Sequence, residues 1–273
     1  MCHELHSKAK LMKSIFKLFL LSPIVIYLGC NSIPVSEIVT EEKEIVEEIK
    51  LANKLVEIET PYGFERLKTN DYGNWMRNLN LKKDNVVYYY NGEEKPDQSI
   101  HVAVLDFDIG DKDLQQCADA CMRIRAEYLF EQKKVNEITF LLASGKWKPF
   151  VKYTTKKDYP SFRKYMNYIF SYANTASLKK QLNSVSNFKD IQIGDVLVQS
   201  GNPYGHAVTV MDVCENTKGE KQFLLSQSYM PAQSIEILIN PNSTTNSPWY
   251  STNFEGNLIT PEWVFAKEDL KRF

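Results

Sequence analysis

The chain has 273 residues, of which 25% are charged and 43% hydrophobic, and its formal net charge is −1. This is the composition of a globular protein with room for one large domain or two small ones. The near-zero charge, without a basic stripe that alternates with aromatic residues, argues against nucleic acid as a partner.

The first 30 residues have the pattern of an export signal (1–30). Four lysines between positions 8 and 17 lead into an apolar run, Ile15 to Leu28, that is too short to span a bilayer well. A small residue and Cys30 end the run, which is similar to a bacterial lipoprotein signal and predicts Cys30 as the lipidated first residue of the mature protein. The alternative is an ordinary signal with an incidental cysteine, and Met12 offers a second start beside Met1.

This signal predicts an exported protein that meets the membrane only through a lipid anchor. The residues after the cysteine, Asn31-Ser32-Ile33-Pro34, lack the acidic side chains that favour surface display, so the periplasmic face of the cell envelope is expected. Three cysteines then remain, and an odd number cannot pair fully within one chain. Cys117 and Cys121 lie four residues apart on an expected helix, a poor geometry for a bridge. At least one free thiol is therefore expected.

Hydrophobic spacing predicts a tether and acidic amphipathic helix (31–60) followed by a single α+β domain (61–273). The expected elements are strands at 86–90 and 100–108, a long helix from Leu114 to about Lys133, a strand at 137–143, helices at 161–172 and 176–185, and antiparallel strands at 196–199, 207–214, 223–227 and 235–239. Asp113 is expected to cap the long helix, with Gln116 three residues on. Thr260 and Pro261 resemble the start of a short helix.

Two polar residues in this pattern predict nucleophilic chemistry. Cys117 lies in the first turns of the long helix, where the helix dipole lowers a thiol pKa, and His206 starts a strand as a potential base. Gln227, on the next strand, is expected to return near His206 and orient it, and Asp212 is a weaker candidate for that role. The Cys117 N–H and the side chains of Gln115 or Gln116 are expected oxyanion donors.

Each of these residues also has a structural interpretation. Cys117 lies on the apolar face of its helix as a buried small residue would, His206 could bond a loop carbonyl, and His101 is expected to be structural. Two histidines and scattered thiols form no metal-ligand cluster, so neither a metal nor another cofactor is expected. A non-catalytic interpretation keeps the cleft for binding, with the lining residues Tyr204, Tyr229, Gln233 and Trp249.

From Pro61 to Phe273 the chain resembles a family of uncharacterised Bacteroidota lipoproteins, the domain of unknown function numbered 4846. The strings that carry this resemblance are Thr60-Pro61-Tyr62-Gly63-Phe64, Asp113-Leu114-Gln115-Gln116-Cys117-Ala118-Asp119-Ala120, Gly205-His206-Ala207-Val208, Gln227-Ser228-Tyr229-Met230-Pro231-Ala232-Gln233 and Ser247-Pro248-Trp249-Tyr250. The resemblance implies a compartment but no activity.

A second, local resemblance concerns the strand that His206 begins. Gly194-Asp195-Val196 followed by Gly205-His206-Ala207-Val208 is similar to the histidine half of papain-like bacterial cell-wall amidases and endopeptidases. It implies His206 as base and Gln227 as its orienting partner, in a papain-like core with a long central helix packed on an antiparallel sheet. The residues around Cys117 depart from that pattern, because Gln116 precedes it and Ala118-Asp119 follow.

Together these features predict a cysteine amidase or peptidase that acts on cell-wall peptides, with Cys117 as nucleophile. The alternative is an envelope lipoprotein that binds a peptidoglycan peptide or glycan fragment in the equivalent cleft without cleaving it. A papain-like lipid acyltransferase is a third interpretation, but in such enzymes the histidine precedes the cysteine along the chain, which is opposite to the order here.

Overall fold

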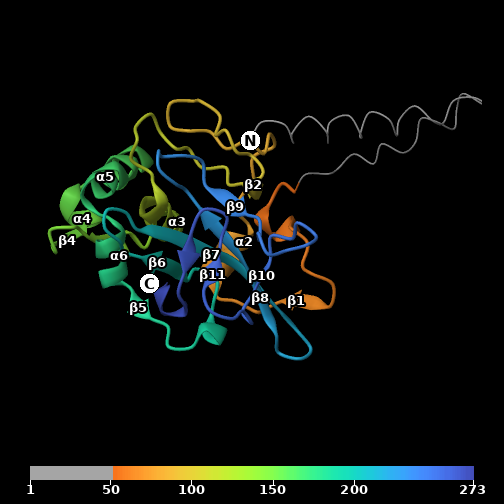
Figure 1. Ribbon diagram of the computed structural model, residues 1–273. Helices are drawn as coiled ribbons and strands as arrows, with labels where there is room; N and C mark the ends of the chain where they lie inside the picture. The colour runs from red at the N-terminus through yellow and green to blue at the C-terminus, as the bar shows by residue number, and fades with distance from the viewer. Residues whose placement is uncertain (1–51) are drawn as a thin grey trace, which may run out of the picture. The chain divides into compact units, whose positions relative to one another are not determined.

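The computed structural model describes residues 52–273 (Figure 1). The predicted signal, the lipidated Cys30 and most of the tether lie outside the described residues. The described residues belong to one compact unit. Residues ahead of 61 also pack into it: Leu55, in the short 3-10 turn Leu55–Glu57, is fully buried, and the Trp249 indole N–H donates to the Glu59 carbonyl at 2.7 Å. None of the described helices is both long and apolar enough to cross a bilayer.

A large antiparallel sheet organises the unit, with strand order β2-β9-β8-β7-β6-β13-β5. β1 also pairs with β7, and β10 with β8. The strands are β1 Phe64–Arg66, β2 His101–Val104, β5 Asn183–Ser184, β6 Val196–Gln199, β7 His206–Asn216, β8 Lys221–Gln227, β9 Glu236–Leu238, β10 Tyr250–Ser251 and β13 Leu270–Arg272. Two hairpins stand apart from this sheet, β3 Thr139–Leu141 with β4 Trp147–Pro149, and β11 Leu258–Ile259 with β12 Val264–Phe265.

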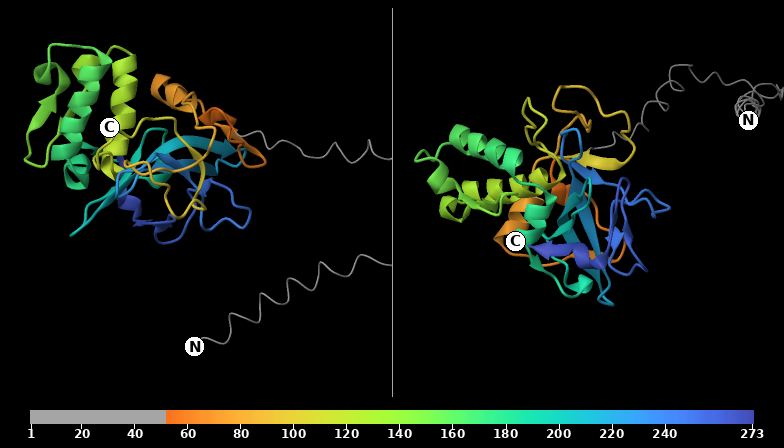
Figure 2. Two further views of the ribbon diagram at one scale, coloured as in Figure 1. Left: turned by 90° about the horizontal axis from the view of Figure 1, so that it is seen from above. Right: turned by 60° about the vertical axis from the view of Figure 1, so that its left-hand side comes forward.

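The described helices are α2 Asp71–Arg77, α3 Cys117–Glu131, α4 Phe150–Tyr153, α5 Tyr159–Tyr172 and α6 Thr175–Gln181, with 3-10 turns at Val135–Glu137, Phe188–Asp190 and Lys267–Asp269. Helices α2, α3 and α6 pack on strands of this sheet, whereas α4 and α5 lie beside it (Figure 2). Most residues of α3 are buried, because the helix lies between β7 and α5. The predicted α+β class, with a long helix packed on an antiparallel sheet, is therefore confirmed.

Two predicted elements are wrong. The segment 86–90 makes only isolated bridges, because side chains take its N–H groups: Gln98 accepts from Val87 at 3.0 Å and Ser234 accepts from Tyr88 at 3.1 Å. The expected helix after Thr260 is instead the tight turn of the β11–β12 hairpin, in which the Thr260 N–H donates to the Trp263 carbonyl at 2.8 Å. The predicted helix 176–185 is also shorter, since α6 ends at Gln181.

Candidate functional site

The long helix begins at Cys117 rather than at Leu114, which places this cysteine at the first helical position. Gln116 is the N-cap, and its N–H donates to the Asp119 carboxylate at 3.1 Å. Asp113, the predicted cap, instead accepts from the Ala232 N–H at 2.7 Å. Asp113 is thus engaged in a tertiary contact, and Asp119 forms the capping box with Gln116 instead.

The Cys117 side chain is enclosed, with 7% of its surface exposed. Its Sγ lies 3.9 Å from the Gly205 carbonyl oxygen. No side chain fits at Gly205, because a Cβ there would lie 2.3 Å from the Gln199 oxygen and 2.7 Å from Thr175 Oγ1. Burial raises the pKa of the Cys117 thiol to about 11, and the neighbouring Asp119 adds to the rise. The expected lowering by the helix dipole is therefore wrong here, since desolvation outweighs it.

His206 opens β7 and is 1% exposed. Its ring lies among three aromatic rings, with centroids at 5.0 Å from Tyr229, 5.3 Å from Trp263 and 5.8 Å from Phe265. Burial lowers the pKa of His206 to about 4, although its contact with Gln227 opposes this shift. The imidazole is thus neutral at pH 7.

Gln227, the last residue of β8, fixes the tautomer of His206. Its Nε2 donates to Glu236 Oε1 at 3.0 Å and to Glu262 Oε2 at 2.5 Å. Two carboxylates on the nitrogen side leave the Gln227 Oε1 to face His206 Nε2, at 2.9 Å. Because an amide oxygen only accepts, His206 Nε2 must carry the proton and Nδ1 must hold the lone pair. The predicted orienting contact is therefore present.

A buried charge cluster lies behind Gln227. Lys95 Nζ is 3.0 Å from Glu236 Oε1 and 2.8 Å from Glu262 Oε2, and His101 Nδ1 is 3.4 Å from Glu236 Oε2. Burial alone would raise the pKa of Glu236, but His101, Lys95 and Gln227 outweigh it and hold the pKa below its ordinary value. Lys95 and His101 show the converse, since burial lowers each pKa but their carboxylate partners raise it overall. His101 therefore supports the site through Glu236.

Sequence reasoning missed this cluster. Glu236 carried one signal, because a carboxylate within the apolar strand at 235–239 calls for a buried partner. Lys95 and Glu262 lie in connecting segments, and nothing in the sequence joins them to Glu236. Gln233, predicted as a cleft residue, also belongs to the cluster: its Nε2 donates to Glu236 Oε1 at 2.8 Å.

Cys117 and His206 line the same cavity, of about 210 Å³. Its other walls are Pro203, Tyr204, Gly205, Tyr229, Met230 and Trp263. A second cavity of about 280 Å³ shares Cys117 and Tyr204 with the first, and its wall is more polar, with Asp113, Gln116, Asp119, Asn174 and Thr175. The thiol therefore stands where two cavities adjoin, and the predicted residues Tyr204 and Tyr229 do line a recess beside it.

Three predicted site residues lie elsewhere. Gln115 is 1% exposed and lines neither cavity, so its side chain does not reach the cleft, and its Oε1 accepts from Arg123 Nη1 at 2.9 Å. Trp249, directly before β10, is buried, lines neither cavity, and donates its indole N–H to the Glu59 carbonyl. Asp212 is held by Arg66 at 2.6 Å and Arg77 at 2.7 Å, which precludes the weaker alternative of orienting His206.

The described cysteines, Cys117, Cys121 and Cys214, are all unpaired and buried, which confirms the expected free thiol. Burial raises the pKa of Cys121 to about 12, in line with its expected place in the core. Within residues 52–273, no group of three histidine, cysteine or carboxylate side chains is placed to hold a metal ion.

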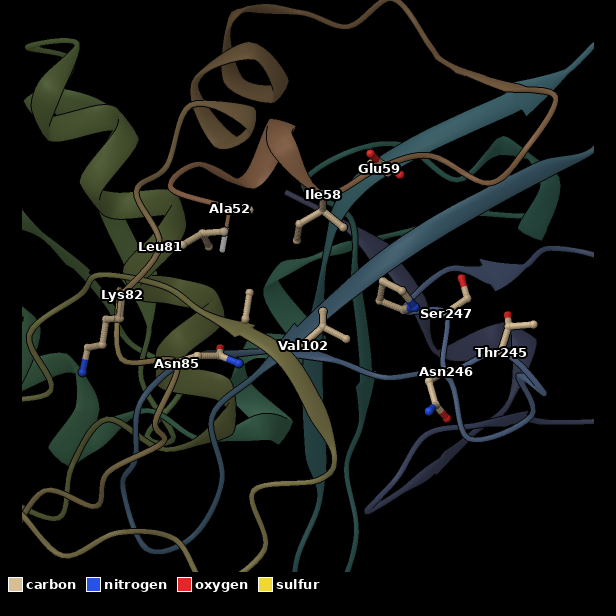
Figure 3. Close-up of a pocket in the computed structure, with 12 residues that line it drawn as sticks. Ala52, Ile58, Glu59, Leu81, Lys82, Asn85, Val102, Thr245, Asn246 and Ser247 are labelled. Carbon is tan, nitrogen blue, oxygen red and sulfur yellow. The ribbon is translucent and has the colours of Figure 1, made fainter. Parts of the chain in front are cut away.

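A larger cavity, of about 350 Å³, lies on another part of the surface between β2 and the loop at 245–248 (Figure 3). Its charged lining residues are Glu59 and Lys82, and Lys82 points away from its centre in Figure 3. Neither cysteine nor histidine lines it, so it lacks the nucleophile and base of the cavity beside Cys117.

Comparison with curated proteins and with solved structures found no match. A family model, described as a domain of unknown function (4846), matches residues 55–272. The match covers nearly all of the compact unit, including both cavities beside Cys117 and the charge cluster. The chain therefore belongs to the family of domain of unknown function 4846.

Proposed function

We propose that this protein is a cysteine hydrolase of amide bonds with a papain-like arrangement of nucleophile and base. One observation carries the proposal: Cys117, at the start of a helix, and His206, held by Gln227, line one cavity. A cysteine that only fills space in a core needs no base beside it. Here a base lines the same cavity, and Gln227, held by two carboxylates, fixes its tautomer.

The geometry supports the following reaction. His206 Nδ1 accepts the proton of the Cys117 thiol while Sγ attacks the amide carbon, and the carbonyl oxygen becomes an oxyanion. The Cys117 N–H has no acceptor within its own helix and can donate to this oxyanion. Protonated His206 then gives its proton to the leaving nitrogen as the C–N bond breaks. Water, deprotonated by His206, hydrolyses the thioester, releases the acid and restores the thiol.

The resting pair is a neutral thiol and a neutral imidazole, because burial disfavours the charged form of both. Proton transfer therefore accompanies attack instead of preceding it. This predicts that alkylation of Cys117 by iodoacetamide accelerates as pH rises from 6 to 9, about tenfold per pH unit, because only the thiolate reacts. A rate that is flat across this range would contradict a neutral resting pair.

The two adjoining cavities support a substrate that extends on both sides of the cleaved bond. Aromatic residues dominate the first, whereas Asp113 and Asp119 line the second. Burial raises the pKa of Asp119 well above its ordinary value, so Asp113 is the carboxylate that gives this wall its charge. An acidic wall favours a neutral or amine-bearing peptide over an anionic one. Peptidoglycan stem peptides, which carry amine groups and isopeptide bonds, are the substrate we propose, in an exported protein anchored at the periplasmic face through Cys30.

Purified residues 50–273 test the activity, with release of new amino groups from peptidoglycan fragments as the measurement. We expect Cys117→Ala and His206→Ala to lower the rate at least about 10³-fold, because each removes a group that acts directly in the reaction. The matched control is Cys214→Ala, which removes another buried free thiol. Equal alkylation of the protein and of Cys117→Ala, located by mass spectrometry, would remove Cys117 as nucleophile.

A second candidate function is binding without cleavage, and the enclosure of Cys117 favours it. In that case peptidoglycan fragments bind the protein and Cys117→Ala with equal affinity, and neither protein releases amino groups. Isothermal titration with the two proteins separates the candidates. The anchor is tested apart from activity: incorporation of labelled palmitate into the full chain should disappear in Cys30→Ala.

A further inference from the structure

Positive charge is concentrated in one segment of the chain. Residues 133–180 contain ten lysines and one arginine but only two acidic residues, Glu137 and Asp158, so the segment carries +9 in a chain of net charge −1. This segment contains β3, β4, α4, α5 and nearly all of α6, which form a helical lobe beside the sheet (Figures 1 and 2). The lobe is thus strongly basic, whereas the rest of the molecule is acidic.

Aromatic rings are exposed on the same lobe. Trp147 on β4 is 55% exposed and Tyr172 at the end of α5 is 56% exposed. Lys164, Tyr168 and Tyr172 follow one another at four-residue spacing and so share one face of α5.

Contacts join β4 to this face of α5. Lys148 Nζ lies 4.9 Å from the ring centroid of Tyr168, and the rings of Tyr168 and Tyr172 are 4.7 Å apart. Lys148 thus ties β4 to this face of α5, whereas Trp147, the preceding residue of β4, projects from the other side of the strand. We define the basic aromatic patch as six residues of this lobe that are exposed or half-buried: Lys146, Trp147, Lys152, Lys164, Tyr168 and Tyr172.

The charges of this patch are not used within the protein. Lys146, Lys152 and Lys164 are exposed, and none of them forms an ion pair or hydrogen bond with a side chain in the described part of the chain. The one arginine of the lobe, Arg163, faces Asp108 at 3.4 Å and is largely buried. Exposed charges held without partners beside exposed rings are what an external anionic surface would bind.

The shape of the patch favours a bilayer over a chain-like polyanion. None of its residues lines any of the cavities described above. Its cations are lysines, which act as point charges, not the arginines that fork onto individual phosphates. Tryptophan and tyrosine gather at the interface between lipid and water. We propose that this patch docks the protein onto the surface of an anionic phospholipid bilayer.

The proposed docking has a consequence for the cleft. Phe170, two residues before Tyr172 on α5, lines the second cavity beside Cys117. The same helix therefore carries the bilayer contact on one side and a wall of the cleft on another, so docking would hold the cleft at a fixed height above the lipid. The proposal does not depend on catalysis, because every measurement below is of binding.

Co-sedimentation of residues 50–273 with vesicles tests the proposal, and this segment is used because a lipid anchor would bind vesicles by itself. We expect binding to vesicles of phosphatidylglycerol and phosphatidylethanolamine, little binding to pure phosphatidylcholine, and release in about 1 M salt, where the Debye length is about 3 Å. The triple variant Lys146→Glu, Lys152→Glu, Lys164→Glu should weaken binding at least about tenfold.

The matched control makes the same charge change elsewhere, in Lys68→Glu, Lys83→Glu, Lys218→Glu, which are also exposed. Binding by this control should stay within about twofold of the unaltered protein. Equal weakening by both triple variants would overturn the proposal, because net charge and not the patch would then govern binding. Patch-dependent binding to heparin or RNA without binding to anionic vesicles would overturn it in favour of a soluble polyanion.

Tryptophan emission gives a second, independent test. Among the four tryptophans, Trp147 is the one with a largely exposed side chain, so insertion at the lipid interface should shift emission to the blue. The shift should disappear in Trp147→Phe while binding persists. A shift that is unchanged in Trp147→Phe would contradict contact through the patch, and a preserved thermal transition in each variant checks that the fold is intact.

Discussion

The two halves of the candidate site are built differently. His206 is fixed from behind by Gln227, which is held in turn by Glu236, Glu262 and Lys95 through hydrogen bonds and ion pairs. Cys117 has no such support, and the contact of its Sγ with the Gly205 carbonyl oxygen is long, at 3.9 Å. The base is thus positioned by buried charges and the thiol by backbone packing alone.

Because the two halves are held differently, mutations in them should affect different properties of the protein, the stability of the fold in one case and the reactivity of the thiol in the other. Buried charged groups lose much of their hydration on folding, so removing one partner leaves the others unsatisfied at a high free-energy cost. A thiol in van der Waals contact leaves no charge behind when it is removed. Mutations behind His206 should therefore lower the free energy of unfolding strongly, whereas mutations at Cys117 should affect reactivity while the fold remains.

The largest effect is expected at Glu236, the centre of the charge cluster. Glu236→Ala leaves Lys95 and His101 without their shared carboxylate, and we expect the free energy of unfolding to fall by about 3–5 kcal/mol. Urea denaturation followed by circular dichroism measures this loss.

The control for Glu236 removes both members of the main ion pair. In the double variant Lys95→Met, Glu236→Leu the lysine charge is removed together with its buried carboxylate partner, so the loss should be smaller than in Glu236→Ala. A double variant less stable than the single one would show that the cluster stabilises the fold directly, beyond the cost of an unpaired charge.

The next effect is a pH dependence that His206 adds to stability. Its pKa is about 4 in the folded protein and about 6.5 when unfolded, so between these values the unfolded chain takes up a proton that the folded one excludes. The contribution is therefore lost as pH falls from about 6.5 to 4, by up to about 3 kcal/mol. In His206→Gln this part of the pH dependence should vanish in urea denaturation at a series of pH values.

His101 provides the control, because its pKa is raised in the folded protein. Its contribution is present below the unfolded pKa and lost as pH rises through the folded value, which is the opposite sign. His101→Gln should therefore steepen the loss of stability on acidification, whereas His206→Gln reduces it. The same direction of change in both variants would contradict the assigned shifts.

A smaller effect is expected on the cysteine side, at Gly205. Gly205→Ala forces a Cβ against the Gln199 oxygen and Thr175, so the segment must shift, and we expect a loss of about 1–3 kcal/mol. The shift also moves the carbonyl that contacts Cys117, so alkylation of this thiol should change as well. Ser200→Ala, an exposed position in the same loop, is the control and should cost less than about 0.5 kcal/mol.

The sequence allowed the histidine half to be predicted better than the cysteine half. Two apolar runs separated by a turn at 216–219 predicted the β7–β8 hairpin, and the return of the chain brought Gln227 to His206. The helix start was misplaced because Asp113 is a better N-cap residue type than Gln116, whereas in the fold Asp113 accepts from Ala232 and Gln116 caps the helix together with Asp119. The prediction of a lowered thiol pKa was wrong for a related reason. The loop at Gly205 buries Cys117, and this contact between distant segments cannot be derived from the local sequence.

The smallest effect on stability is expected at the nucleophile itself. Cys117→Ala removes one sulfur that has no strong hydrogen bond, and the helix keeps its cap at Gln116. We expect the free energy of unfolding to change by less than about 1 kcal/mol, since the loss of buried surface is small and no polar group is left unsatisfied. Urea denaturation beside the Glu236→Ala measurement places both on one scale. A loss above about 2 kcal/mol would mean that Cys117 is a packing residue of the core, and that a drop in amide hydrolysis in this variant could not be assigned to lost chemistry.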